Sequence, residues 1–472
     1  MFEPLIPGKP RRWQGFYDHA PAPARHFFTS ARGWLLARRR NAPETLSLLH
    51  VLRTHEPWTA TDIASYQLHA LRQALDHARS TVPFYKSYPQ VNLDSLDDLR
   101  RLPILSRETV VENQDRLLSV SIPPHCRIRA GTAVTTSANL TVAYTEELAR
   151  DNWAFLLRQW AWADVHPRHP RLSLFGARIV PAKRHDPPFW THNLPERQIL
   201  LSISHLSDST APAYLALLRK HKGEVLEGFP SALSLLADFV LLRDERIPMR
   251  VVFTTGEPLY PSIRAKIEEV FQTRVFDSYG MTEYCGLVQQ CERGQMHLAP
   301  EYGYLEILND RDEPVARGEE GYFIWTGFFN RAMPLIRYRI NDRDRWDSLP
   351  CACGLAFTTV VPTITRESDF LRSTDGRLFS PRTLTQILKQ SNSLRFCQFI
   401  HDRPERVVIR AVPSNGRRAA KETMEIRANL QELLGPAMKV IVELAAAPLS
   451  RPSGKIPLIV NQVIARRCEG HF

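Results

Sequence analysis

The sequence lacks the segments that mark a membrane-spanning or secreted protein. Its 472 residues contain no apolar run long enough to form a transmembrane helix. Arg11 and Arg12 are followed by polar and aromatic residues instead of the apolar stretch of a signal peptide. Internal repeats and low-complexity tracts are also missing. With a hydrophobic content of 43% and a charged content of 24%, these absences predict a soluble globular protein of the cytoplasm.

Disulfide bonds are not expected, because seven cysteines are a small and odd number for a chain of this length. They indicate reduced thiols or a metal site. The net charge of +11 fits an anionic partner, but the 61 lysines and arginines are spread widely, so nucleic acid is not the expected partner. The densest cluster, at residues 31–40, fits a solvated helix face, a membrane surface or an acidic partner. A homodimer is compatible with this composition.

The length predicts two or three domains, and the order of the expected elements predicts an α/β fold. Between about 170 and 330, β-branched runs such as 251–255 alternate with helical stretches such as 261–271. This alternation indicates a largely parallel sheet with sites at the carboxyl ends of its strands. Helical spacing also predicts a helix over 61–80, and the turn-rich stretch 303–363 predicts an antiparallel subdomain.

A domain boundary is expected near residues 362–368. It divides the chain into an N-terminal domain, 1–364, and a C-terminal domain, 365–472. The second part alternates strand-like and helix-like runs, as a compact α+β domain would. Its expected strands lie at 406–409 and 439–442, and its expected helices at 382–390 and 416–434.

The run 277–286, Asp-Ser-Tyr-Gly-Met-Thr-Glu-Tyr-Cys-Gly, carries more chemical information than any other segment. It follows a β-like segment, so a ring, a glycine turn, a hydroxyl and a carboxylate come together where a strand is predicted to end. The ring of Tyr279 can cover a purine, and Gly280 lets the backbone approach phosphate. Thr282 can bond a phosphate oxygen, and Glu283 can hold Mg²⁺. The alternative is a polar loop that closes a buried strand.

Three further segments have the composition of a nucleotide site. Residues 254–258, Thr-Thr-Gly-Glu-Pro, end a predicted strand with a glycine turn, so this loop and the tyrosine motif could flank one nucleotide. Residues 334–342 are predicted to form a strand that ends in Asp342, whose carboxylate can accept hydrogen bonds from vicinal ribose hydroxyls. Residues 451–457 place Lys455 in a tight turn, where an exposed surface lysine is the alternative.

Taken in order, these motifs resemble those of the adenylate-forming superfamily of acyl-CoA synthetases, and within it the phenylacetate-CoA ligase branch with its CapK-type relatives. The resemblance covers nearly the whole chain. It rests on residues 75–85, 187–190, 227–231, 256–258, 279–283, 334–342 and 453–455. It implies the adenylate-forming fold, with a large N-terminal α/β domain that carries a β subdomain, and a small α+β C-terminal domain that moves as a lid.

The resemblance implies a two-step reaction. A carboxylic acid attacks the α-phosphate of ATP and releases pyrophosphate, and the acyl-adenylate then passes to CoA or to another thiol, such as that of a carrier protein. Transfer to an amine or a hydroxyl is the alternative. Aromatic residues at 153–162 and 189–190 favour an aryl or other planar acid, although large aromatic side chains also simply pack.

The resemblance also assigns roles to residues. Lys455 would bind the carboxylate and the α-phosphate, and Glu283 would hold Mg²⁺. Asp342 would bind the ribose and Tyr279 the adenine. The remaining nucleotide-contacting candidates in these motifs are Gly256, Glu257, Pro258, Asp277, Ser278, Gly280, Met281 and Thr282.

Two further positions take expectations from the resemblance. Arg366 matches an arginine that contacts phosphate or ribose, at a hinge where Ser368 replaces the usual aspartate; this replacement weakens the case for a thioester step. His205, in a Ser-X-His-Leu-Ser pattern of the CapK-type relatives, is a candidate for the acyl pocket together with Tyr279 and Gly280. A core or surface histidine is the alternative.

One motif departs from the pattern of the superfamily. Its phosphate-binding loop is expected at 134–145, where this chain has no glycine. The hydroxyls of Thr135, Thr136 and Ser137 remain, but a position that needs a positive φ costs about 1–2 kcal/mol without glycine. Gly131 could supply the turn in a shifted register. The alternatives are an active enzyme with a modified loop, an adenylate-forming enzyme of altered activity, and a catalytically silent relative.

Four cysteine and histidine residues have the spacing of a metal site. They form two short pairs, Cys291 with His297 and Cys351 with Cys353. Three thiolates and one imidazole can surround Zn²⁺ as a closed structural tetrahedron. Some ligases of the resembling branch carry cysteines at similar positions. Four unlinked thiols and imidazoles are the alternative, and Cys285 is a rival ligand.

Overall fold

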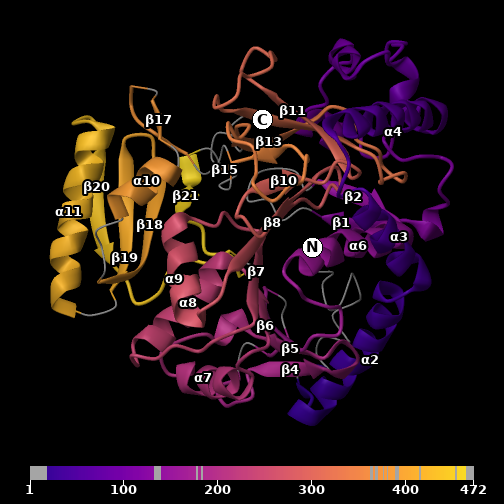
Figure 1. The fold of residues 1–472 in the computed structure, drawn as a ribbon. Helices are drawn as coiled ribbons and strands as arrows, with labels where there is room; N and C mark the ends of the chain where they lie inside the picture. Colours follow the sequence, from indigo (N-terminus) through magenta and orange to yellow (C-terminus); the bar gives the residue numbers. More distant parts are fainter. Residues whose placement is uncertain are drawn as a thin grey trace.

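The computed structural model describes residues 17, 19–131, 140–176, 179–181, 184–361, 365–366, 370–375, 377–379, 381–388, 393–413, 416–451 and 454–463. Figure 1 shows a large α/β body and a smaller unit at its side, formed by the C-terminal part of the chain. None of the described helices is both long enough and apolar enough to cross a bilayer.

The centre of the body is a sheet that has nine strands among the described residues. Its order is β14-β10-β9-β8-β7-β6-β3-β5-β4. The strands are β3 (Arg171–Leu174), β4 (Trp190–Asn193), β5 (Gln198–Leu201), β6 (Val225–Gly228), β7 (Val251–Thr255), β8 (Val275–Gly280), β9 (Leu287–Gln290), β10 (Met296–Leu298) and β14 (Thr359–Val360). The five neighbours β5, β3, β6, β7 and β8 are parallel, which confirms the predicted α/β class.

Helices cover both faces of this sheet, because its strands are apolar on both sides. One face packs against α7 (Ala211–Lys220), α8 (Pro230–Leu241) and α9 (Pro261–Phe271). The other face packs against α6 (Glu146–Trp162), whose Trp153 and Trp160 join the cluster around Phe253 and Phe276. The predicted strand 251–255 and helix 261–271 are both confirmed.

A second, antiparallel sheet confirms the expected β subdomain. It has the order β11 (Gly303–Leu308), β12 (Gly321–Gly327), β13 (Tyr338–Asp344) and β15 (Thr365–Arg366). β14, which also falls in the predicted stretch, instead pairs with β10 at the edge of the large sheet. A short hairpin of β1 (Ile128–Gly131) and β2 (Thr141–Tyr144) packs nearby.

The N-terminal part is helical. It comprises α2 (Ala22–Arg40), α3 (Pro43–Thr54), α4 (Ala60–Thr81), α5 (Arg107–Glu112) and the 3₁₀ turns η1 (Pro83–Ser87), η2 (Leu96–Arg101) and η3 (Pro124–Cys126). The predicted helix over 61–80 is α4, which begins with a capping box between Thr59 and Asp62.

The C-terminal part forms a compact unit with its own apolar core. Its sheet has the order β20 (Lys439–Leu444), β19 (Arg406–Pro413), β18 (Leu394–Arg403) and β21 (Ile459–Asn461). The helices α10 (Pro381–Leu388) and α11 (Gly416–Leu434) and the hairpin β16 (Leu371–Arg372) and β17 (Leu378–Phe379) complete it. Its core includes Phe399, Ile409 and Leu430. The predicted α+β character is confirmed, whereas division at residue 364 stays a prediction.

Two expected strand ends are wrong, and both lie in the motifs. The tyrosine motif was predicted to begin in a turn, but β8 continues to Gly280 because Ser278, Tyr279 and Gly280 pair with β9. Asp342 was predicted at the end of a strand, but it lies inside β13, opposite Arg366 of β15.

Candidate active site

The carboxyl ends of β7 and β8 are joined by side-chain hydrogen bonds. The hydroxyl of Thr254 donates to Asp277 Oδ1 at 2.6 Å, and the hydroxyl of Thr255 donates to the carbonyl of Ser278 at 2.8 Å. Asp277 is buried, and burial raises the pKa of its carboxyl to about 7. These contacts fix the two loops relative to each other. Asp277 is therefore buried within the sheet and bonded to Thr254. Its contact with a nucleotide stays a prediction.

Tyr279 and Asp342 meet at the end of the large sheet, although they come from different sheets. The Tyr279 hydroxyl donates to Asp342 Oδ2 at 2.6 Å. The Tyr279 ring also packs edge-on against Phe323, with 6.0 Å between centroids. The predicted adenine-binding ring and the predicted ribose-binding carboxylate therefore lie side by side, as one nucleoside would require.

Glu283 lies in the turn after β8 and is buried. Its Oε1 lies 3.7 Å from Arg107 Nη1 and 3.4 Å from the Tyr338 hydroxyl. Both distances are longer than a strong charged hydrogen bond, so neither contact is a tight one. Mg²⁺ in nucleotide sites is usually held by one or two carboxylates and by substrate phosphates, which fits a single buried carboxylate here. No pattern in the sequence pointed to Arg107 as a member of this site.

Lys455 reaches from the C-terminal unit to the loop after β7. Its ammonium donates to the carbonyl of Gly256 and lies 5.3 Å from the centroid of Phe229. Gly256 has φ 81°, and a Cβ there would come within 3.0 Å of Phe229 and 3.2 Å of Lys455 Nζ. Only glycine allows this close approach without strain. Lys455 thus lies at the Gly256 turn, which the sequence analysis predicted to flank a nucleotide.

Glu257 fastens the same loop to the C-terminal unit. Its two carboxylate oxygens accept from the backbone amides of Ser231 and Ile456, each at 3.0 Å. Burial raises the pKa of Glu257, and these two hydrogen bonds oppose that shift. The following residue, Pro258, continues the connection to α9. We call Gly256, Tyr279, Glu283, Asp342 and Lys455 the nucleotide corner.

Other predicted residues of the motif support the corner through packing. Met281 is buried in the core, and the Cys285 thiol lies 3.1 Å from its sulfur. Gly280 and Thr282 flank Met281: Gly280 ends β8, and Thr282 lies in the turn that follows β8. Thr135, Thr136, Ser137 and Ser368 lie outside the described residues. Arg366 is described only by its backbone, which pairs with Asp342.

His205 is held by protein groups at both ring nitrogens. Nδ1 lies 2.7 Å from the Ser202 hydroxyl, and Nε2 lies 3.0 Å from the carbonyl of Pro181. A proton on Nε2 satisfies both contacts, since the carbonyl can only accept. Burial lowers the pKa of His205, and the ring stacks on Phe189. This geometry favours the alternative of a core histidine, and its contact with substrate stays a prediction.

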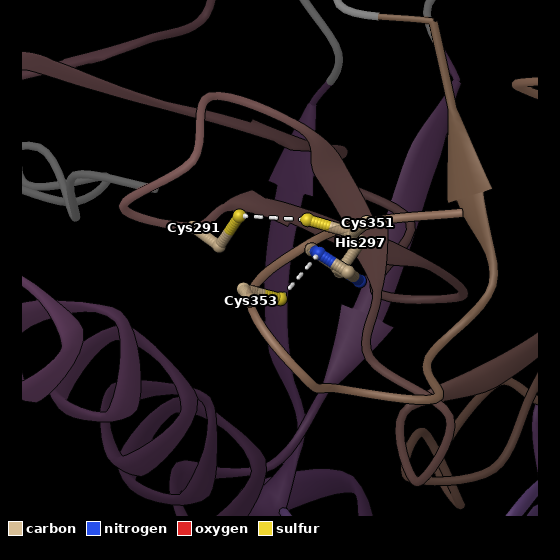
Figure 2. Close-up of side chains that lie close together, drawn as sticks. All are labelled: Cys291, His297, Cys351 and Cys353. Carbon is tan, nitrogen blue, oxygen red and sulfur yellow. Dashed lines mark hydrogen bonds between the residues drawn. The ribbon is translucent and has the colours of Figure 1, made fainter. Parts of the chain in front are cut away.

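The four predicted metal ligands come together (Figure 2). Their donor atoms lie within 4.8 Å of one another, at the edge formed by β9, β10 and β14. Cys291 Sγ lies 3.6 Å from Cys351 Sγ, and Cys353 Sγ lies 3.3 Å from His297 Nε2. Thiolates and an imidazole in a zinc tetrahedron are separated by about 3.5–3.8 Å, given the usual bond lengths. Cys285 is not a member of this cluster.

The environment of His297 and Cys353 suits a cation. His297 Nδ1 donates to the carbonyl of Phe357 at 2.9 Å, so Nε2 keeps its lone pair and points it toward the thiols. Burial raises the pKa of Cys353 to about 12, and the thiols of Cys351 and Cys291 add to the rise. A bound cation would act in the opposite direction, because it stabilises the thiolate. The donor set therefore fits Zn²⁺.

Comparison with known proteins agrees with this fold and these motifs. Residues 199–328, which include the strands that carry the tyrosine motif, match the family described as AMP-binding enzyme. The matched segment includes the Gly256 turn and Tyr279, so the similarity falls on the candidate site and on the strands that carry it.

More particularly, the chain is similar to protein CapK of Staphylococcus aureus, at 22% identity over 95% of this chain and 99% of that protein. It is also similar to the phenylacetate-coenzyme A ligase of Thermus thermophilus, at 22% identity over 66% of this chain and 71% of that protein. The resemblance to this branch is confirmed.

A solved structure of 2-hydroxyisobutyryl-CoA ligase in the postadenylation state has the same fold. Its TM-score is 0.67 at 18% identity, over 88% of this chain and 93% of that chain. A structure of the same ligase in the thioesterification state gives a TM-score of 0.52 at 17% identity, over 95% of this chain and 96% of that chain. The predicted adenylate-forming fold is therefore confirmed.

Proposed function

We propose that this protein activates a carboxylic acid with ATP to form an acyl-adenylate, and then transfers the acyl group to the thiol of CoA. The observation that carries the proposal is the nucleotide corner. There, a lysine from the C-terminal unit lies against the glycine turn after β7, and Tyr279 is bonded to Asp342. The match to AMP-binding enzymes supports the use of ATP, and the similarity to phenylacetate-coenzyme A ligases supports CoA as acceptor.

In the first step a carboxylate oxygen forms a bond to the α-phosphorus, the bond to the β-phosphate oxygen breaks, and pyrophosphate leaves. Negative charge gathers on the α-phosphoryl oxygens during this step. We assign its stabilisation to the Lys455 ammonium, which is half-buried and lies beside the Phe229 ring. A preorganised charge in such a sheltered place contributes on the order of 3–4 kcal/mol.

The other corner residues would hold the nucleotide. Tyr279 would pack on the adenine, and Asp342 would accept from ribose hydroxyls while it keeps its bond from Tyr279. Glu283 would supply one oxygen to Mg²⁺, whose charge neutralises phosphate oxygens when it is bound. In the second step the sulfur of CoA forms a bond to the acyl carbon, AMP leaves, and the thiol proton passes to solvent.

The arrangement of the two units supports the adenylation half of this cycle. Lys455 contacts Gly256, and Arg395 of the C-terminal unit pairs with Asp208 at 2.9 Å and lies over the Phe239 ring. The higher TM-score to the postadenylation structure than to the thioesterification structure agrees with this arrangement. We therefore propose that the C-terminal unit must move for the thiol to reach the adenylate.

ATP–pyrophosphate exchange across a panel of aryl and alkyl carboxylic acids tests the proposal. We expect exchange with at least one acid, and its loss in Lys455→Ala. Binding of ATP without exchange for any acid would overturn the enzyme proposal in favour of the silent relative, which the glycine-free loop at 134–145 allows. Exchange that persists in Lys455→Ala would overturn only the role of the lysine.

We also propose that Cys291, His297, Cys351 and Cys353 hold one structural Zn²⁺. Four protein ligands leave no open position, so this ion would join the β9–β10 hairpin to the loop before β14 and take no part in the reaction. Metal analysis of the purified protein tests this. We expect about one zinc per chain, its loss in Cys351→Ser, and its retention in Cys126→Ser, which removes an exposed thiol elsewhere. Wild-type protein without zinc would contradict the assignment.

A further inference from the structure

Helix α2 exposes an apolar stripe to solvent. Phe27, Trp34 and Leu35 have exposed fractions of 69%, 51% and 62%, and Phe28 is also exposed. These positions recur at the spacing that places side chains on one face of a helix. The opposite face, which includes the buried Gly33, packs toward β4 (Figure 1). The stripe is therefore the outer face of a helix that is already fixed to the fold.

Neighbouring side chains enlarge this surface. Leu194, in the turn η4 (Leu194–Glu196), is 70% exposed, and its backbone amide donates to the Ser30 hydroxyl of α2 at 3.2 Å. Leu46 and Val51 are exposed on the next helix, α3. Of the thirteen exposed large apolar side chains among the described residues, these seven lie on α2, η4 and α3. We call Phe27, Phe28, Trp34, Leu35 and Leu194 the α2 face.

The charged residues of α2 itself are all basic. The helix has no acidic residue, and its last turn contains Arg38, Arg39 and Arg40. Arg39 pairs with Glu146, and Arg40 pairs with Glu196 at 2.9 Å. Arg38 points along the stripe, with its guanidinium 4.7 Å from the centroid of Trp34, and has no ion-pair partner among the described residues. A cation thus lies within the exposed apolar surface.

We propose that the α2 face binds the surface of a lipid bilayer that carries anionic headgroups. Phenylalanine, tryptophan and leucine enter the boundary between headgroups and acyl chains, while Arg38 contacts the phosphates. The anionic surface also attracts a chain with a net charge of +11. A second copy on the same face is disfavoured, because its α2 would present no acidic residue to Arg38. The helix would lie on the bilayer without spanning it.

Cosedimentation of the full chain with lipid vesicles tests this proposal. The vesicles contain phosphatidylcholine alone, or phosphatidylcholine and phosphatidylglycerol in equal amounts. We expect binding to the anionic vesicles that weakens with added salt. Trp34→Ser combined with Leu35→Ser should lower the partition coefficient by about a hundredfold or more, because each buried apolar side chain is worth one to two powers of ten. Arg38→Gln should lower it about fivefold.

A matched control is Leu349→Ser, which removes a side chain that is 65% exposed and lies far along the chain from α2. It should leave vesicle binding unchanged. The proposal is overturned by failure of the wild-type protein to bind anionic vesicles, or by equal loss of binding in Leu349→Ser. It is also overturned if the wild-type protein sediments as a dimer that Trp34→Ser with Leu35→Ser converts to monomer, since a second copy would then cover the face. None of these results depends on adenylate formation.

Discussion

The nucleotide corner and the cysteine–histidine cluster lie at opposite ends of β9, but they are built differently. At one end, Leu287 of β9 pairs with Gly280 in the tyrosine motif, and the polar groups of the corner bond to other protein groups. At the other end, Cys291 follows β9 directly, and four donor atoms face one another. The corner can therefore keep its shape without a ligand, whereas the cluster would be completed by the proposed zinc ion.

This difference predicts that changes in the two regions will separate in experiments. A side-chain change at Lys455 or Tyr279 of the corner should alter catalysis and leave the free energy of unfolding nearly unchanged. A change in the cluster should alter stability first. Each of the following variants can break or sharpen that separation.

The largest effect is expected for Lys455→Ala. Loss of the ammonium should slow ATP–pyrophosphate exchange about a thousandfold, which corresponds to about 4 kcal/mol in the barrier. The melting temperature should stay near that of wild type, because the side chain is only half-buried. Lys421→Ala, which removes an 81% exposed lysine of the same unit, should leave both properties unchanged. A large loss of stability in Lys455→Ala would break the separation.

Asp277 lies beneath the corner and should affect stability through pH. Burial raises the pKa of its carboxyl to about 7, whereas the unfolded chain has an ordinary value of about 4. The folded state therefore holds an extra proton between these values, and its stability falls as pH rises from about 4 to 7, by about 3–4 kcal/mol. Asp277→Asn should remove this part of the pH dependence in denaturant titrations.

Asp115→Asn is the control for that experiment, since Asp115 has an 88% exposed side chain. Its titration curve should match that of wild type. If Asp277→Asn shows the same fall in stability between pH 4 and 7 as wild type, the buried carboxyl is not the source of the effect.

Removal of the ion should destabilise the cluster. We expect Cys351→Ser, or a strong zinc chelator, to lower the free energy of unfolding by about 2–3 kcal/mol, since the ligands would lose their shared cation. Chelator should have no further effect on Cys351→Ser. Exchange activity of the folded variant should stay within a few-fold of wild type. Loss of activity at unchanged stability would reverse the expected roles of the two regions.

The smallest effect is expected for Tyr279→Phe. The ring can still pack on adenine, but Asp342 loses a hydrogen bond of 2.6 Å. We expect the KM for ATP to rise about fivefold, or about 1 kcal/mol, with little change in kcat. Tyr304→Phe on β11 serves as the control. A kcat effect larger than the KM effect would show that the bond acts in the transition state.

Much of the fold could be predicted, because its signals are local. The apolar spacing over α4 and the alternation of β7, α9 and β8 depend only on residues that are close together in the chain. The ends of the strands were harder to predict from the sequence. Whether 278–280 form a turn or a strand depends on pairing with β9, and Asp342 lies mid-strand because β15 pairs with it. Such pairings join residues far apart in the chain and have no local pattern.

The candidate site was predictable only in part, for the same reason. The order of the motifs was enough to bring Tyr279 to Asp342 and Lys455 to Gly256. Arg107 beside Glu283 had no pattern to reveal it, since its contact spans the chain. For 31–40, the sequence could not decide between a solvated face and a binding face, because side-chain exposure depends on where β4 packs.

The central claim, attack of a carboxylate on the α-phosphate of ATP, can be tested by isotope transfer. The protein is incubated with ATP, CoA and an ¹⁸O-labelled carboxylic acid that supports exchange, and the products are analysed by mass spectrometry. Our account predicts that one labelled oxygen of the acid appears in AMP and that pyrophosphate carries none. Label in inorganic phosphate, with ADP in place of AMP, would contradict it.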